Sequence, residues 1–354
     1  MKKKVIKISA VILVPLLIAG CITGFVITKK EMDKNFGRGE YPDKRYTATW
    51  FYDHYEEEYP RQEVSFKSGE NDLKGFIYGA DKDRGLIVFA HGIGSGHEFY
   101  LGLITRLVDR GWRVFAYDCT GSGYSEGDGT VGLAQSALDL DSALTFAEGD
   151  SRLNSLDTFV LGHSWGGYAS AAVLNFDHDI KGCVTMSGYN TPFEELAETC
   201  DGMFGGASKL IYPFVWAYNK ATFGKNASLS AVEGINKSGI PVLVMHGDKD
   251  DVIAYDGASI IAHKDEITNP NVEYRVFSEE DRNGHNSYFN TSEYTEYKKM
   301  ILTPLQDELN EKYNNDVPEE ELIRFYESID GELYNGFNVE VVELIDSFFG
   351  KTQN

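Results

Sequence analysis

The sequence predicts an α/β protein with a mostly parallel central sheet flanked by helices. From about residue 61 onward, short apolar runs alternate with segments that are long enough to form helices. Runs that are apolar throughout are typical of strands covered on both faces, and this alternation is typical of a parallel sheet. With 354 residues, 42% of them hydrophobic, the chain can bury a large core in one domain or in two smaller ones.

Each expected element can be placed in chain order. A hairpin comes first, because Ser68–Asn71 has the composition of a turn between two strand-like runs. The expected strands cover residues 63–66, 73–78, 86–90, 114–117, 158–161, 182–186, 241–245 and 272–277. The expected helices cover residues 99–110, 131–147, the segment that follows Ser164, and 339–349.

We divide the chain into three parts: a membrane segment (1–30), a tether with a packing helix (31–60) and one α/β domain (61–350). Within the domain, residues 189–237 interrupt the alternation and are rich in aromatic side chains. We interpret them as a helical cap over the strand ends, where ligands bind in such sheets. Ordinary helices packed on the core are the alternative. Residues 290–336 are expected to form a charged helical insertion.

The N-terminus predicts a membrane tether. Four lysines among the first seven residues precede an uncharged, mostly apolar run from Ile8 to Thr28, which two further lysines close. A helix of about 20 residues spans the hydrocarbon core of a bilayer, and the basic end stays in the cytoplasm. We therefore expect an uncleaved signal anchor with the α/β domain outside the cytoplasmic membrane. A lipoprotein signal with Cys21 as the lipidated residue, or a cleaved secretory signal, are the alternatives.

Charge and cysteine content exclude several classes of partner. The formal net charge is −22, and residues 1–34 carry seven lysines against two acidic residues, so the remainder carries −27. A surface this acidic repels nucleic acids and anionic membrane surfaces, and we expect no nucleic-acid partner. The four cysteines match neither a metal-binding spacing nor a dense disulfide framework.

The most informative motif is the pentapeptide Gly162–Gly166, in which Ser164 is the central residue. It follows an apolar run and precedes a row of small residues that fits a helix. A sharp turn from strand to helix leaves no room for side chains at the two glycines, and it exposes the serine hydroxyl at the start of the helix. Ser164 is therefore the candidate nucleophile.

A serine nucleophile needs a histidine base and an acid that orients the base. In this architecture both are expected just after later strands, with the acid first. Asp250 follows the strand that ends at residue 245 and is the candidate acid, with Asp248 and Asp251 as alternatives. A metal site formed by all three carboxylates is the competing interpretation. His285 follows the last strand, after a glycine that lets its loop turn tightly.

The negative charge that develops in such a reaction needs backbone N–H donors. We assign one to Trp165, the residue after the nucleophile. The second is assigned to Ile93, in the glycine-rich loop after the strand at 86–90. The reaction needs no cofactor.

These motifs together resemble the α/β-hydrolases, and in particular the bacterial branch that contains monoacylglycerol lipases and the serine aminopeptidase-like families. The matching segments, in order, are His91-Gly92, Asp118–Gly127, Gly162–Gly166, Gly247 with Asp250, and Gly284-His285. The resemblance covers roughly residues 63–289 and the final helix. The chain departs from the family at Thr120, where an arginine is usual, and in the insertion at 290–336.

The resemblance and the residues together predict a serine hydrolase with a Ser164–Asp250–His285 triad. The apolar cap favours a small-molecule carboxylic ester with a hydrophobic acyl or alcohol part. A peptidase that binds the substrate amine through carboxylates of the cap is one alternative, with Glu194, Glu195, Glu198 and Asp201 as its candidates. An acyltransferase that uses the same triad is the other.

Overall fold

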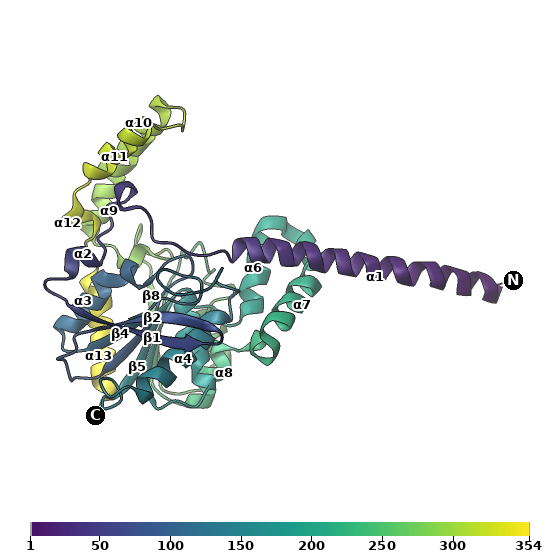
Figure 1. Cartoon of the computed structure of the whole chain (residues 1–354), viewed down its shortest axis with the longest axis horizontal. Coiled ribbons are helices and arrows are strands. Elements are labelled where there is room, and N and C mark those ends of the chain that lie inside the picture. Colours follow the sequence, from purple (N-terminus) through teal and green to yellow (C-terminus); the bar gives the residue numbers. More distant parts are fainter. Residues whose placement is uncertain (1, 354) are drawn as a thin grey trace.

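The computed structural model describes residues 2–353, with side-chain surroundings described from residue 19 onward. Its centre is an eight-stranded sheet in the order β1-β2-β4-β3-β5-β6-β7-β8 (Figure 1). The strands are β1 (Arg61–Ser68), β2 (Asn71–Tyr78), β3 (Leu86–Ala90), β4 (Arg113–Tyr117), β5 (Thr158–His163), β6 (Ile180–Met186), β7 (Val242–Gly247) and β8 (Val272–Phe277). The first hairpin and its junction with β4 are antiparallel, and all other pairs are parallel. The predicted α/β class, with a mostly parallel sheet flanked by helices, is confirmed.

Helices cover both faces of this sheet and bury its apolar strands. On one face, α4 (Gln135–Gly149), α5 (Trp165–Ala172) and α8 (Ala231–Ser238) enclose the first core cluster. On the other face, α3 (Leu101–Asp109) and α13 (Val339–Thr352) enclose the second. All five residues of β3 are buried, as expected for a strand covered on both sides.

One predicted helix boundary was wrong. The helix expected from residue 131 begins at Gln135, because Val131 has a φ of 63° and Gly132 a φ of 158°. Residues in this left-handed region cannot start a right-handed helix. The apolar periodicity of the segment gave no sign of the turn that precedes the helix.

The segment expected to form a cap is helical, but its parts differ in position. It contains α6 (Pro192–Phe204), η4 (Gly205–Leu210), α7 (Tyr212–Phe223), η5 (Gly224–Ser228) and then α8. Because α8 packs on α5, the last part of the segment is an ordinary helix of the core, which was the alternative interpretation. Only the part from α6 to η5 lies at the edge of the domain, where α7 packs beside α1 (Lys2–Asn35; Figure 1).

The insertion after His285 is also helical and projects from the body on the side away from α1 (Figure 1). It contains α9 (Ser292–Tyr297), the π-helical η8 (Lys298–Leu302), α10 (Thr303–Lys312), α11 (Glu319–Glu327) and α12 (Gly331–Tyr334). Glu319, the first residue of α11, accepts hydrogen bonds from Arg45 and Tyr46 of the tether.

Between residues 19 and 353, no helix is long and apolar enough to cross a membrane. Residues 1–18 of the predicted membrane segment lie outside the residues whose side chains the structure describes.

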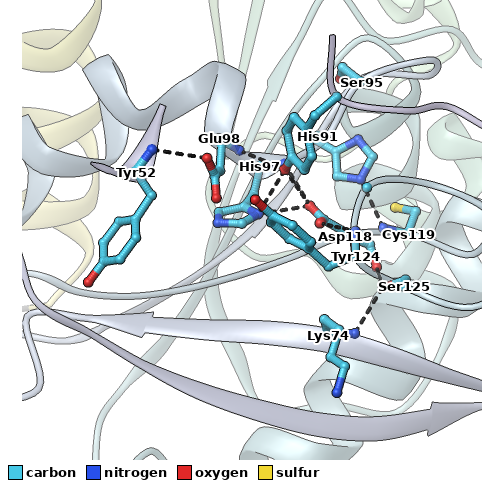
Figure 2. Close-up of polar contacts among 12 residues, drawn as sticks. Tyr52, Lys74, His91, Ser95, His97, Glu98, Asp118, Cys119, Tyr124 and Ser125 are labelled. Atoms are coloured by element: carbon cyan, nitrogen blue, oxygen red, sulfur yellow. Dashed lines mark hydrogen bonds and ion pairs between the residues drawn. The ribbon is translucent and has the colours of Figure 1, made fainter. Parts of the chain in front are cut away.

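A buried polar network attaches residues 31–60 to the domain (Figure 2). The Arg61 guanidinium lies 2.8 Å from the Glu98 carboxylate, which also accepts a hydrogen bond from the backbone N–H of Tyr52 at 3.0 Å. Next to it, His97 Nδ1 lies 2.8 Å from Asp118 Oδ1. Burial alone raises the pKa of Asp118, but the nearby His97 outweighs this effect and lowers it to about 2. The charged carboxylate is thus retained deep in the protein.

We expect Arg61→Met to lower the free energy of unfolding by about 3–5 kcal/mol, because it leaves Glu98 buried and unpaired. The Arg61 and Glu98 side chains are only 7% and 3% exposed. The matched control is Arg45→Met, since the Arg45–Glu319 pair is 56% and 62% exposed. That variant should change the same quantity by less than about 1 kcal/mol. Urea denaturation measures both; losses of equal size would contradict this account of the network.

Candidate active site

Ser164 occupies a strained turn between β5 and α5. Its backbone has a φ of 58° and a ψ of −116°. A Cβ on Gly162 would lie 2.0 Å from the Gly166 carbonyl oxygen, and a Cβ on Gly166 would lie 2.0 Å from that of Ala90. Only glycine fits at these two positions, as the sequence motif indicated. The turn places the Ser164 side chain at the wall of a cavity.

The structure brings together the three residues predicted for the triad. His285 Nε2 lies 2.8 Å from Ser164 Oγ, and His285 Nδ1 lies 2.8 Å from Asp250 Oδ2. Of the alternative acids, Asp248 accepts a hydrogen bond from Asn283 instead, and Asp251 is exposed. In the described part of the chain no group of three or more acidic, histidine or cysteine residues could hold a metal ion.

Asp250 is held in its ionised form. Burial raises its pKa, but hydrogen bonds from His246 and His285 outweigh this effect and keep the pKa well below its usual range. The backbone N–H groups of Val252 and Ile253 also donate to Oδ1, at 3.0 and 2.9 Å. The charge therefore remains available to orient the His285 imidazole and to stabilise its protonated form.

His246 also contacts the acid of the triad, although no sequence motif pointed to it. Its Nε2 lies 3.2 Å from Asp250 Oδ2 and 3.0 Å from the carbonyl oxygen of Ile253. The available signal was its place at the end of β7, directly before the loop that carries the acid.

Both predicted oxyanion donors have free backbone N–H groups. Within the described residues, neither the Ile93 nor the Trp165 amide donates a hydrogen bond to the protein. Ile93 lines the cavity together with Ser164, and Trp165 begins α5, whose N-terminal end favours negative charge. The neighbouring Gly92 amide is already used, because it donates to the Tyr100 hydroxyl at 3.2 Å.

A second histidine connects the loop of Gly92 to His285. Burial, followed by the nearby His285, lowers the pKa of His163 to about 3, so its ring is neutral. The His285 carbonyl oxygen can only accept, and it lies 3.1 Å from His163 Nε2. His163 Nδ1 therefore accepts from the Tyr100 hydroxyl at 2.9 Å, and that hydroxyl accepts from Gly92. One directed chain of hydrogen bonds fixes the backbone on both sides of Ser164.

The cavity beside Ser164 has a volume of 490 Å³ and largely aromatic and apolar walls. None of the residues 189–237 lines it, although this segment was expected to cover the site. Its walls come instead from the segment after β3, from the tether and from the residues at the two ends of the insertion. The large aromatic side chains of the lining are Trp50, Tyr55, Phe99, Tyr100, Phe289, Tyr334 and Phe337.

Direct hydrogen bonds hold these two walls together. The backbone N–H of Trp50 donates to Asn335 Oδ1 at 2.8 Å, and Asn335 Nδ2 donates to the Ala48 carbonyl oxygen at 2.8 Å. The rings of Phe289 and Phe337 stack with centroids 5.4 Å apart. The base of the insertion therefore shapes the entrance to the cavity.

The four carboxylates proposed to bind a substrate amine, Glu194, Glu195, Glu198 and Asp201, lie away from the cavity. Glu198 accepts hydrogen bonds from the backbone N–H groups of Ala254 and Ala258, and Asp201 accepts from Ser208 and Tyr212. Burial, together with the nearby Glu198 and Asp250, raises the pKa of Glu195 to about 8. None of these carboxylates lines the cavity.

Comparisons with known proteins agree with the fold. The family model described as "Serine aminopeptidase, S33" matches residues 81–203. An esterase from Pyrococcus furiosus superposes with a TM-score of 0.52 at 18% identity, over 79% of this chain and 98% of its own. An acylaminoacyl peptidase from Pyrococcus horikoshii superposes with a TM-score of 0.50 at 16% identity, over 75% of this chain and 44% of its own. No curated protein matches the sequence.

The chain therefore has the α/β-hydrolase fold, and its residues 81–203 resemble the serine aminopeptidase family, as the motifs predicted. The family match indicates a hydrolase.

We expect Tyr100→Phe to lower kcat about tenfold with little change in KM, because it removes two hydrogen bonds and keeps the ring in the cavity wall. Removing the hydroxyl leaves the Gly92 amide and His163 Nδ1 without their partner. Steady-state kinetics measures the effect. Tyr55→Phe is the control, since Tyr55 also lines the cavity and its hydroxyl bonds to no described residue. Equal effects of the two variants would contradict a positioning role for Tyr100.

We expect Glu195→Gln to raise the melting temperature at pH 8 but not near pH 4.5. The pKa of Glu195 is 4.5 in the unfolded chain and about 8 in the folded protein. Between these two pH values the unfolded chain has lost a proton that the folded chain keeps. Stability is therefore lost as the pH rises through this window, by about 1.4 kcal/mol for each unit of pKa difference. Glutamine removes this loss. Thermal unfolding of Glu195→Gln at both pH values tests this prediction, with the exposed Glu308→Gln as the control. A melting temperature that rises equally at both pH values would contradict it.

Proposed function

We propose that this protein is a serine hydrolase that cleaves carboxylic esters with a hydrophobic acyl or alcohol part. The observation that supports it most is the hydrogen-bonded chain Ser164–His285–Asp250 at the wall of an aromatic cavity. The cavity lining includes no lysine or arginine and one carboxylate, Glu98, which is paired with Arg61. Such a cavity favours an uncharged substrate.

The proposed mechanism follows from the positions of these groups. Ser164 Oγ attacks the acyl carbonyl while His285 Nε2 takes its proton, and Asp250 stabilises the resulting imidazolium. The amides of Ile93 and Trp165 receive the oxyanion, each contributing about 3 kcal/mol. His285 then returns the proton to the departing alcohol, which leaves an acyl group on Ser164. Water activated by His285 releases the acid and restores the serine, without a cofactor.

Two other functions would use the same triad. The match to the serine aminopeptidase family over residues 81–203 favours a peptidase as the second candidate. A free substrate amine needs an unpaired carboxylate, and Glu98 is bound by Arg61, so an amide substrate without a charged amine fits better. An acyltransferase differs only in the acceptor, and product analysis with added alcohol separates it from a hydrolase.

We further propose that the chain is held at the cytoplasmic membrane by residues 1–30, with the hydrolase domain outside the cytoplasm. The apolar run continues to Thr28, past the position of an early cleavage site, which supports an uncleaved anchor. Lipidation at Cys21 and a cleaved signal are the alternatives. Palmitate labelling that is lost in Cys21→Ala would overturn the uncleaved anchor in favour of a lipoprotein.

We expect p-nitrophenyl esters to be hydrolysed and Ser164→Ala to lower kcat by roughly four to six orders of magnitude. The assay compares esters of increasing acyl length with aminoacyl amides. Ser122→Ala is the matched control, because Ser122 is a buried serine whose hydroxyl has no described partner. If the protein cleaves aminoacyl amides and ignores esters of every chain length, the esterase proposal fails.

A further inference from the structure

The edge of the domain formed by the end of α6, η4 and α7 exposes large apolar side chains. Met203, Phe204, Leu210 and Trp216 are 68%, 51%, 77% and 57% exposed. We call these four residues the cap-edge patch. Single exposed apolar residues are ordinary on a protein surface, but a group of this size within 14 residues of chain marks a contact with another apolar phase.

The charge around the cap-edge patch is opposite to that of the rest of the molecule. Residues 202–232 contain three lysines and no aspartate or glutamate, in a chain with a net charge of −22. Lys209, Lys220 and Lys225 are all exposed, and none of them forms an ion pair with a described residue. The adjacent carboxylate, Asp201, is occupied by Ser208 and Tyr212. The patch is therefore both apolar and cationic.

The packing of α7 on α1 fixes the position of this patch along the predicted membrane segment. A Cβ on Gly24 would lie 2.6 Å from the Phe214 ring, so the two helices are in close contact there. Gly24 belongs to the apolar run that ends at Thr28, and Ile22, Val26 and Ile27 beside it are 58–59% exposed. The helix α7, which carries Trp216 of the patch, thus packs beside the last turns of the apolar run (Figure 1).

We propose that the cap-edge patch docks on the surface of an anionic phospholipid bilayer, next to the point where α1 enters it. Tryptophan and lysine are the residues that settle at the boundary between headgroups and acyl chains, and lysines near an anionic leaflet each add attraction. The strongly acidic remainder of the domain repels the same surface, so only this edge can approach it. Docking here would fix the orientation of the domain on the membrane.

A second copy of the chain fits the patch less well. A two-fold contact would bring the same surface of both molecules together, and the three lysines of one copy would face those of the other. The lipid phosphate groups supply the opposite charge, and the apolar run that ends at Thr28 would continue the apolar surface into the bilayer.

The test uses the full chain in lipid nanodiscs that contain brominated lipids, which quench nearby tryptophan emission. The difference between wild type and Trp216→Phe isolates the emission of Trp216. In discs containing phosphatidylglycerol, we expect this emission to fall by at least about half, because side chains at the interface lie within about 10 Å of the acyl boundary. Emission that is assigned to Trp50 in the same way, through Trp50→Phe, should stay unquenched, because Trp50 packs on α12 of the insertion.

A charge reversal tests the electrostatic part of the proposal. Lys209→Glu, Lys220→Glu and Lys225→Glu together should reduce the quenching of Trp216 by at least about twofold, and leave hydrolysis of a soluble ester unchanged. The matched control reverses Lys298, Lys299 and Lys312 on the insertion. Equal behaviour of the two triple variants, or unquenched Trp216 in anionic discs, would overturn the proposal. Dimers that dissociate in Leu210→Asp would overturn it in favour of self-association.

Retention of the chain in the discs reports on the membrane tether, whereas quenching of Trp216 reports on the cap-edge patch, so the two proposals can fail separately. A chain that is retained without quenching of Trp216 overturns docking alone. A chain that is not retained in the discs overturns both the membrane tether and the docking of the patch.

Discussion

The site depends on one steric constraint, the close approach of three backbone segments around Ser164. Gly162, Gly166 and the end of β3 at Ala90 come so near each other that a single added carbon at either glycine would overlap a carbonyl oxygen. This contact forces Ser164 into a positive φ, which costs energy that the surrounding sheet must offset. The same contact places the loop after β3 next to the nucleophile. The geometry of the nucleophile and of the predicted oxyanion donors therefore has one origin.

Hydrogen bonds extend this constraint outward to the catalytic base and the N-terminal segment. Tyr100 and His163 connect Gly92 to the backbone of His285, so the two sides of the site cannot move independently. Further out, Glu98, which is paired with Arg61, binds the backbone of Tyr52 in the tether. Thr49, Trp50 and Tyr55 of the same segment line the cavity. The tether is thus part of the site as well as a connection to the predicted membrane segment.

Much of the fold and the positions of the triad residues could be predicted because they depend on local signals. The strands at Leu86–Ala90 and Val272–Phe277 have the predicted limits, since apolar runs and turn residues mark their ends. Asp250 and His285 follow from chain order in a parallel sheet. The cavity walls could not be predicted, because Trp50 and Asn335 are 285 residues apart and meet only through tertiary packing. The aromatic content of residues 189–237 indicated a cover for the site. Instead, α7 packs beside α1, and α8 packs on α5 in the core.

The central claim is that Ser164 carries the acyl group during the reaction, and peptide mass spectrometry tests it most directly. The enzyme is mixed with a p-nitrophenyl ester, quenched in acid within the first turnover, and digested for peptide mapping. The account predicts the mass of one acyl group on the peptide that contains Ser164, and none in the presence of a fluorophosphonate that has already modified this residue. Acylation of a different residue, or turnover of the ester with no acyl group on Ser164, would contradict it.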